Sequence, residues 1–158
     1  MRKTDVAGLP STIDSRWRIG IVCSSYYKEE IDALAAGARD LLVAAGIPAA
    51  QIFRHDAPGS FEVPLIGAAL AEAKKVDALI GLGIIVEGET EHARLLAEQA
   101  ARGIMDVQLL YRIPFAFEIL YVRDLQDAQA RAQGDANKGR EAARAVLYSL
   151  AEIRRIAS

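Results

Sequence analysis

The sequence predicts an α/β fold, a three-layer αβα sandwich in which a central parallel sheet of four strands lies between two layers of helices. Four β-type runs alternate with segments whose apolar residues recur at helical spacing, in the order βαβαβαβαα. Alternation of this kind forms a parallel sheet covered on both faces through right-handed crossovers. The run at residues 78–86 is apolar almost throughout, as expected for a strand that is buried on both faces.

The length and net charge of the chain indicate its domain number and exclude some classes of partner. The 158 residues suit a single domain, and we assign residues 1–15 to an N-terminal arm and residues 16–158 to the domain. The formal net charge of −2 gives no electrostatic case for a nucleic-acid partner or an anionic membrane. No apolar run reaches the roughly 18 residues of a membrane span, and no secretory signal is present, so we expect a cytoplasmic protein. The single cysteine, Cys23, lies in a strand pattern and is expected to be a small buried side chain.

In the first half of the chain, residues 17–23 predict the first strand and residues 28–45 the first helix, which Gly46 ends. Residues 51–56 predict a short second strand. A helix over residues 61–75 follows, and Pro64 fits its first turn, where a missing N–H costs nothing. We expect this helix to turn Leu65, Ala69 and Leu70 to the core.

In the second half, residues 78–85 predict the central strand, and Thr90 is a candidate cap for a helix that runs from about residue 91 to 104. Residues 107–110 are interpreted as a short extended piece, and residues 113–122 as the last strand. Two helices, over residues 125–132 and 138–155, close the chain.

Polar and aromatic residues collect where the predicted strands end. Tyr26 follows the first strand, Ser60, Phe61 and Glu62 follow the second, and Glu89, Thr90 and His92 follow the third, while Phe117 lies in the fourth. Ligands of open α/β sheets bind at this carboxyl edge. An aromatic ring, a carboxylate and an imidazole suit a flat polar heterocycle, and helix N-termini suit a phosphate. Because Tyr26 and Tyr27 are adjacent in an extended segment, we expect at most one of them to face the crevice.

Other common chemistries lack their motifs. The sequence contains no P-loop, GxGxxG, GxSxG or metal-spaced Cys/His cluster. Glu87, Glu89 and Glu91 stand beside His92, but glutamates without a second nearby histidine are a weak metal signal. We therefore expect neither a metal nor a cofactor. His92 on its own could also be a surface histidine at the start of a helix.

Three motifs resemble those of the 6,7-dimethyl-8-ribityllumazine synthase family, which catalyses the penultimate step of riboflavin biosynthesis. Residues 58–64 (PGSFEVP) resemble the family motif PG(A/S)(F/Y/W)E(I/L)P. Residues 88–92 (GETEH) resemble GxTxH, and residues 137–143 (NKGREAA) resemble NKGxEAA. The motifs occur in the family order and at closely matching spacing, and the resemblance covers about residues 18–153.

The resemblance implies a flavodoxin-like sandwich and a condensation without metal or cofactor. The implied substrates are 5-amino-6-(D-ribitylamino)uracil and 3,4-dihydroxy-2-butanone 4-phosphate (below, the ribitylaminouracil and the butanone phosphate). They combine to 6,7-dimethyl-8-ribityllumazine by imine formation, phosphate elimination and ring closure with loss of water. His92 then becomes the catalytic proton-transfer residue, and Phe117 reaches the site of a neighbouring subunit. The implied substrate-binding residues are Tyr26, Ser60, Phe61, Glu62, Ile84, Ile85, Val86, Glu89, Thr90, Phe117 and Arg131.

The roles within this set also follow from the resemblance. Tyr26 takes the place of the aromatic residue that stacks on the pyrimidine, and residues 60–62 bind the pyrimidine and its ribityl chain. The backbone of residues 84–86 contacts the ring. Glu89 and Thr90 stand where backbone amides hold the phosphate, with Arg131 as its cationic partner.

The chain departs from the family pattern at several positions. Glu87 stands where Arg is common, and Ala93 where Phe is common. Glu118 and Tyr121 replace small residues, and Tyr27 stands where Asn is common. Glu87 brings a negative charge close to an anionic substrate, which would weaken phosphate binding or shift substrate choice.

The family assembles as homopentamers, and some members form icosahedral shells of sixty subunits. In the family, the N-terminal arm joins a neighbour's sheet. Riboflavin synthase is a further possible partner. Two alternatives remain open on the sequence: a catalytically weakened or retuned homologue that serves as a container or scaffold, and a flavin- or pterin-binding module of the same fold.

Overall fold

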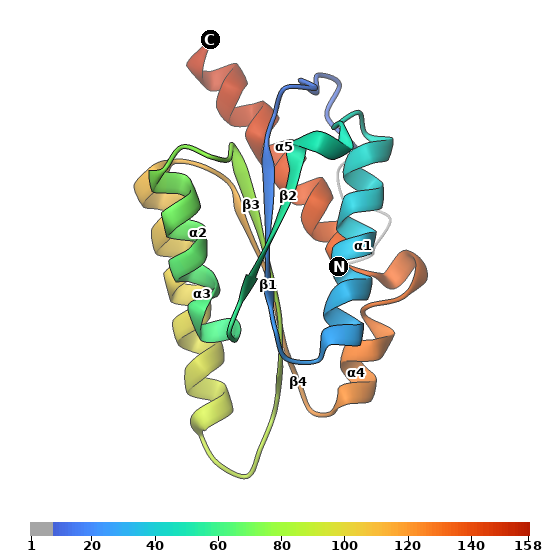
Figure 1. Ribbon diagram of the computed structural model, residues 1–158, viewed down its shortest axis with the longest axis vertical. Helices are drawn as coiled ribbons and strands as arrows, with labels where there is room; N and C mark the ends of the chain where they lie inside the picture. The colour runs from blue at the N-terminus through green and yellow to red at the C-terminus, as the bar shows by residue number, and fades with distance from the viewer. Residues whose placement is uncertain (1–7) are drawn as a thin grey trace.

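Four strands form one parallel sheet in the computed structural model, which describes residues 8–158. They are β1 (Ile19–Ser24), β2 (Ile52–Ala57), β3 (Ala78–Val86) and β4 (Phe115–Val122), in the order β2-β1-β3-β4. Helices α2 (Val63–Glu72) and α3 (His92–Tyr111) cover one face of the sheet. The other face is covered by α1 (Lys28–Ala44), α4 (Leu125–Ala130) and α5 (Lys138–Ala157) (Figure 1). The predicted three-layer αβα sandwich with a parallel four-stranded sheet is therefore confirmed.

The central strand β3 contributes to two cores because its side chains alternate between the faces of the sheet. Ile80, Leu82 and Ile84 pack toward α1 and α5. Leu79 and Ile85 pack toward α2 and α3. A strand covered on both faces explains why the sequence shows an apolar run here rather than an alternation.

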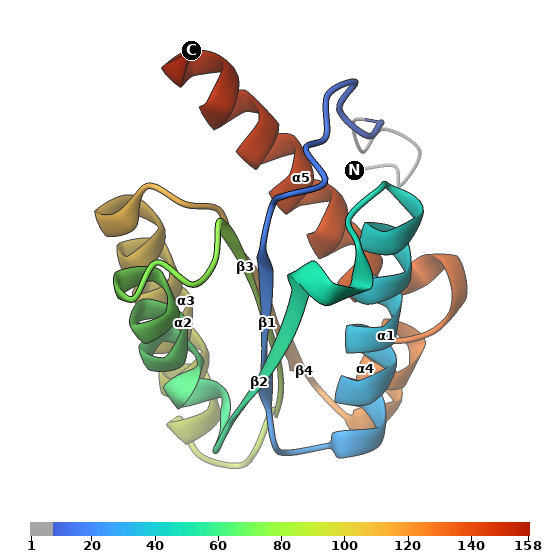
Figure 2. The same ribbon diagram turned by 45° about the horizontal axis from the view of Figure 1, so that its top comes forward.

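The carboxyl ends of all four strands lie at one end of the molecule, away from the C-terminus of α5 (Figures 1 and 2). Loops from β1, β2, β3 and β4 therefore meet at this edge, as the parallel topology requires. A short 3₁₀ turn, η3 (Ser60–Glu62), lies between β2 and α2, and two others are η2 (Ala49–Gln51) and η4 (Gly134–Ala136).

Helix α3 is longer than predicted. Residues 107–110 are helical, and the expected extended piece is wrong. Val107 continues the buried stripe of Ala97, Ala100 and Ile104, so the helix gains apolar contact by running on to Tyr111. β4 accordingly begins at Phe115, two residues later than expected.

Helix α2 presents a largely different face to the core from the one predicted. Leu65 is 67% exposed and Ala69 is exposed, whereas Val63, Gly67 and Ala71 are buried. Of the three residues predicted to face the core, only Leu70 packs against it, and it is half-buried. A side chain at Gly67 would collide with the ring of Phe115, so small residues allow this helix to lie close to the sheet. The smallest residues, not the largest, thus face the sheet, and Leu65 points outward.

Other local predictions are confirmed with shifts of one to three residues at the ends. Gly46 has φ 111° after α1, and Pro64 lies in the first turn of α2. No described helix is both long and apolar enough to cross a membrane. Within the arm, residues 1–7 lie outside the described residues, and residues 8–15 contain neither helix nor strand.

Candidate functional site

A cleft of about 430 Å³ opens at the carboxyl edge of the sheet. Its lining comes from the loop after β1, the η3 turn, the end of β3 and the start of α3. Most of the predicted site residues line it together, namely Tyr26, Ser60, Phe61, Glu62, Ile84, Ile85, Val86 and His92. Residues from four separate segments of the chain thus converge as the strand order predicts.

The loop after β1 contributes two aromatic rings. Both Tyr26 and Tyr27 line the cleft, so the expectation that at most one faces it is wrong. Alternation holds only for extended backbone, and Tyr27 has φ 56° and ψ 53°, in the left-handed region. This turn redirects the chain into α1 and is strained for a residue with a side chain.

The η3 turn lies directly against the sheet. The Ser60 side chain is buried over Gly83 of β3, where any side chain on the glycine would collide with the serine hydroxyl. Phe61 is exposed at the cleft, and Glu62 is partly exposed. The glycine in β3 therefore makes room for the turn that carries the aromatic ring and the carboxylate.

The sequence reasoning missed two lining residues besides Tyr27. A Cβ at Gly59 would lie 3.3 Å from the Tyr26 ring and 3.5 Å from Glu62 Oε2, so both groups lie against this glycine. The glycine of the PGSFEVP motif was the available signal. Leu96 also lines the cleft, one turn into α3, and its helical spacing from His92 was the signal for it.

His92 is the first residue of α3 and is exposed at the cleft. Its backbone N–H donates a long hydrogen bond of 3.4 Å to Thr90 Oγ1. The predicted cap at Thr90 is wrong, because the helix begins one residue later and its N-cap residue is Glu91, whose side chain makes no capping bond. Thr90 and Glu89 themselves lie on the exposed loop of residues 87–91 and do not line the cleft. A nearby cation is already engaged, because Arg94 donates to Glu91 at 2.6 Å and to Glu98 at 2.9 Å.

Two further predicted residues are not brought to the cleft of their own chain. Phe117 lies on the edge strand β4 opposite Gly81, well before the strand end, and is 45% exposed. Arg131 caps the C-terminus of α4, in the other helix layer, where its Nη1 donates to the Asp127 carbonyl at 2.9 Å. Neither residue lines the cleft.

Glu118 follows Phe117 and is half-buried. Its pKa is raised to about 7, mainly by burial and also by the negative charge of Glu141, while the positive charge of Lys138 acts in the opposite direction. Lys138 Nζ is 2.8 Å from Glu141 Oε2. A carboxyl group therefore titrates near neutral pH outside the cleft.

The described part of the chain, residues 8–158, contains no group of three or more His, Cys, Asp or Glu placed to hold a metal ion. Cys23 is buried, and burial raises the pKa of its thiol to about 11. A thiol of this kind is a poor nucleophile at neutral pH.

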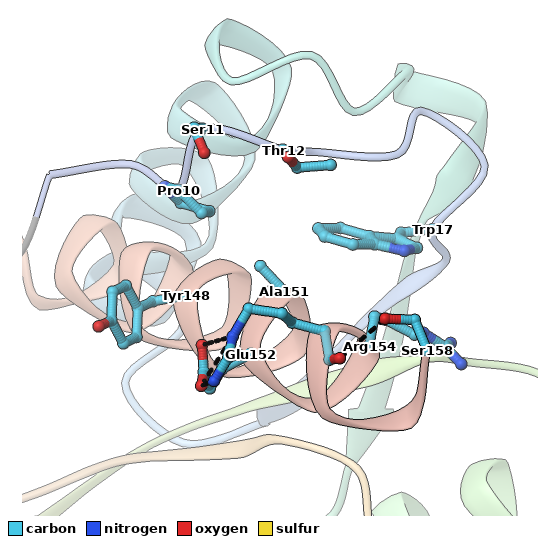
Figure 3. A pocket seen from close by; sticks show the side chains of 10 residues that line it. Pro10, Ser11, Thr12, Trp17, Tyr148, Ala151, Glu152, Arg154 and Ser158 are labelled. Carbon is cyan, nitrogen blue, oxygen red and sulfur yellow. Dashed lines mark hydrogen bonds and ion pairs between the residues drawn. The ribbon is translucent and has the colours of Figure 1, made fainter.

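A second pocket, of about 490 Å³, lies at the opposite, amino edge of the sheet (Figure 3). Trp17 and Tyr148 contribute aromatic surface to it. Its cations are paired within the chain: Arg154 donates to Asp77 at 3.0 Å, and Arg155 pairs with Glu152. None of the predicted site residues lines this pocket, so the carboxyl-edge cleft is the candidate site.

Comparison with known proteins identifies the family of this chain. The sequence profile described as 6,7-dimethyl-8-ribityllumazine synthase matches residues 16–154. A protein of that name from Levilactobacillus brevis is 36% identical over 93% of this chain and 93% of its own length. The 6,7-dimethyl-8-ribityllumazine synthase 1 of Caulobacter vibrioides is 39% identical, covering 88% of this chain and 92% of its own. The protein of that name from Paracidovorax citrulli is 40% identical, covering 89% and 90%.

Proposed function

Since this chain belongs to the 6,7-dimethyl-8-ribityllumazine synthase family, we propose that its carboxyl-edge cleft is where it performs the family reaction. The enzyme condenses the ribitylaminouracil with the butanone phosphate and releases phosphate and water. The observation that carries the site assignment is the convergence of Tyr26, Phe61, Glu62 and His92 on one cleft.

The pyrimidine occupies the aromatic part of the cleft. Tyr26 and Phe61 offer flat apolar faces to the ring, and Glu62 is an acceptor for the N–H and hydroxyl groups of the substrate. Backbone groups at the end of β3 (residues 84–86) and Ser60 complete this part of the site. Tyr27 adds a second ring beside Tyr26, which supports an assignment of the cleft to a planar substrate.

His92 transfers protons in the reaction. The amino group of the pyrimidine attacks the carbonyl carbon of the butanone phosphate, and water leaves as the imine forms. Loss of a proton from carbon then expels phosphate, and attack of the second nitrogen closes the ring with loss of water. Each step moves a proton, and an imidazole can both accept and donate one near neutral pH.

The phosphate lies at the start of α3, beside the exposed loop of residues 87–91, where the backbone amides of Glu89 and Thr90 bind it. Glu87 and Glu91 make this region negative, so a cation is needed to balance the phosphate. Arg131 supplies this charge from a neighbouring subunit, because it does not line the cleft of its own chain. Phe117 reaches the neighbour's site in the same way.

The protein is a homopentamer or a shell of sixty subunits in this proposal. Large apolar side chains on the outside of α3 and on β4 support such an interface, namely Met105, Leu109, Leu110, Phe117 and Tyr121. Contact with riboflavin synthase and a cytoplasmic location stay predictions. A weakened homologue that serves as a container would rest on the departures at Glu87, Ala93, Glu118 and Tyr121, whereas the relatives named above all carry the name of the synthase.

An assay with both substrates tests the proposal through the absorbance and fluorescence of the lumazine product. The wild-type enzyme should form product, and His92→Ala should lower kcat by about 10²-fold while the pyrimidine still binds. His55→Ala is the matched control, since His55 is exposed on β2 and does not line the cleft. An unchanged rate in His92→Ala would remove His92 from its role.

Arg131→Ala tests the phosphate assignment separately. It should raise KM for the butanone phosphate by about tenfold or more, because a charge-assisted bond to the phosphate is lost. KM for the ribitylaminouracil should change little. An unaltered KM for the phosphate substrate would exclude Arg131 from phosphate binding.

A further inference from the structure

The side chain of Asn137 is buried at the junction of three elements, with 7% of its surface exposed. Its Nδ2 group donates to the Ala33 carbonyl of α1 at 3.0 Å and to the Ala132 carbonyl, after α4, at 2.9 Å. Its Oδ1 accepts from the N–H groups of Gly139 at 2.8 Å and Arg140 at 3.3 Å, in the first turn of α5. One amide therefore joins α1, the segment after α4, and α5.

Two glycines make the space for this amide. A Cβ at Gly37, on α1, would lie 2.5 Å from the amide atoms of Asn137. A Cβ at Gly139 would collide with the carbonyl of Leu34 on α1. Helices α1 and α5 thus approach closely here, and the asparagine amide fills the remaining space between them.

The segment that the amide holds contains Arg131. The backbone N–H of Lys138 donates to the Arg131 carbonyl at 2.8 Å, next to the bond from Asn137 to Ala132. Adjacent carbonyls of the segment are thereby bound by adjacent residues at the start of α5. α4 is also tied to α1, because Gln129 donates to the buried Glu30 carboxylate at 3.1 Å.

Helix capping alone does not account for this residue. Ser or Asp caps a helix as well as Asn does, because capping uses only the acceptor oxygen. Only the amide adds two N–H donors, and both are spent on carbonyls outside α5. Capping does not need the Nδ2 group of Asn137, and it is this group that binds the segment containing Arg131.

Resting on the proposed function of Arg131, we propose that Asn137 is a positioning residue for recognition of the phosphate-bearing substrate. It fixes the backbone from which Arg131 extends, and does not itself touch the substrate. Loss of the two donors lets this segment move, so that the guanidinium no longer meets the phosphate in its productive geometry.

Asn137→Asp separates the two uses of the side chain. The carboxylate still accepts from Gly139 and Arg140, but it presents an oxygen to the carbonyls of Ala33 and Ala132. We expect KM for the butanone phosphate to rise by about tenfold or more, close to the effect of Arg131→Ala. KM for the ribitylaminouracil and kcat at saturation should change little. Asn137→Ser, which caps without adding a charge, should give the same pattern.

Two further variants distinguish a loss of positioning from a general loss of stability. Gly37→Ala leaves Asn137 in the sequence but displaces its amide, and should raise the same KM. Leu150→Ala opens a cavity in the buried part of α5, far along the helix from Asn137, and should lower the thermal midpoint without changing this KM.

A double-mutant cycle decides between positioning and a separate effect. If Asn137 acts through Arg131, Asn137→Asp should add nothing to the KM of the Arg131→Ala variant. Fully additive effects would overturn the inference, and so would an Asn137→Asp variant with wild-type KM while Arg131→Ala raises it. If Arg131→Ala alone leaves KM unchanged, the phosphate role of Arg131 is wrong, and this inference fails with it.

Discussion

The loop of residues 87–91 and the turn of residues 131–139 both carry polar groups proposed to serve the phosphate, yet they are built in opposite ways. The loop is exposed along its length. The N-cap residue of α3, Glu91, makes no side-chain capping bond, and the bond from the His92 N–H to Thr90 is long, at 3.4 Å. The turn is organised by a buried amide with four hydrogen bonds. The loop keeps its backbone groups accessible to a ligand. In the turn, by contrast, the polar groups of Asn137 are all hydrogen-bonded within the chain.

The same substitution in the two regions should give the largest contrast. Gly139→Ala places a methyl group against the Leu34 carbonyl and should lower the free energy of unfolding by about 2–3 kcal/mol. Gly88→Ala has open space around it and should change the free energy by less than about 0.5 kcal/mol. Urea unfolding measures both. Equal effects would mean that the turn is no more tightly built than the loop.

Glu118→Gln tests the charged neighbours of the turn. The pKa of Glu118 is raised to about 7 in the folded chain, so between about pH 4.5 and 7 the unfolded state loses this proton while the folded state keeps it. The stability that Glu118 contributes therefore falls as pH rises through this window, and levels off above it. The variant should match wild type near pH 4 and exceed it by about 2 kcal/mol at pH 8.

Thermal or urea unfolding of both proteins across this pH range measures the difference. Glu141→Gln is a useful companion, because it removes the negative charge that faces Glu118. It also removes the ion-pair partner of Lys138, so it should give a smaller gain. A Glu118→Gln gain that is constant with pH would contradict the raised pKa.

Glu87→Gln is the matching change on the loop and should have the smallest effect. Glu87 is exposed, so its loss should leave stability unchanged and lower KM for the butanone phosphate by about two- to fivefold at low salt. Added salt should shrink this difference, because it screens exposed charges. Glu72→Gln, at the end of α2, is the control. A Glu87→Gln variant with unchanged KM at low salt would show that the phosphate does not sense this charge.

Periodicity predicted the layers because apolar spacing reports burial directly. The apolar spacing also indicates the full length of α3, since Val107 continues the spacing of Ala100 and Ile104. The prediction failed there because residues 107–110 (Val-Gln-Leu-Leu), taken alone, resemble a strand. The buried face of α2 could not be predicted in this way. That helix is apolar nearly all round, and its orientation depends on the close approach of Gly67 to Phe115.

The residues of the candidate site also fall into those that the sequence predicts and those that it does not. Tyr26, Glu62 and His92 were predicted because parallel strands bring their ends to one edge. The left-handed backbone of Tyr27 and the hydrogen bonds of the Asn137 amide were not predicted, because each depends on contacts between segments distant in sequence. Gly134-Asp135-Ala136-Asn137 indicated a turn, but not that the amide of its last residue reaches α1.

The burial of Asn137 also affects how readily this residue deamidates. Asparagine deamidates when the next backbone nitrogen attacks its side-chain carbonyl carbon, and the hydrolysed product includes aspartate. Here that nitrogen, of Lys138, is bound to the Arg131 carbonyl at 2.8 Å, and the amide is held by its own four bonds. The folded chain should therefore resist this damage, while molecules stored unfolded should accumulate it at Asn137, as peptide mass spectrometry of the two samples would reveal.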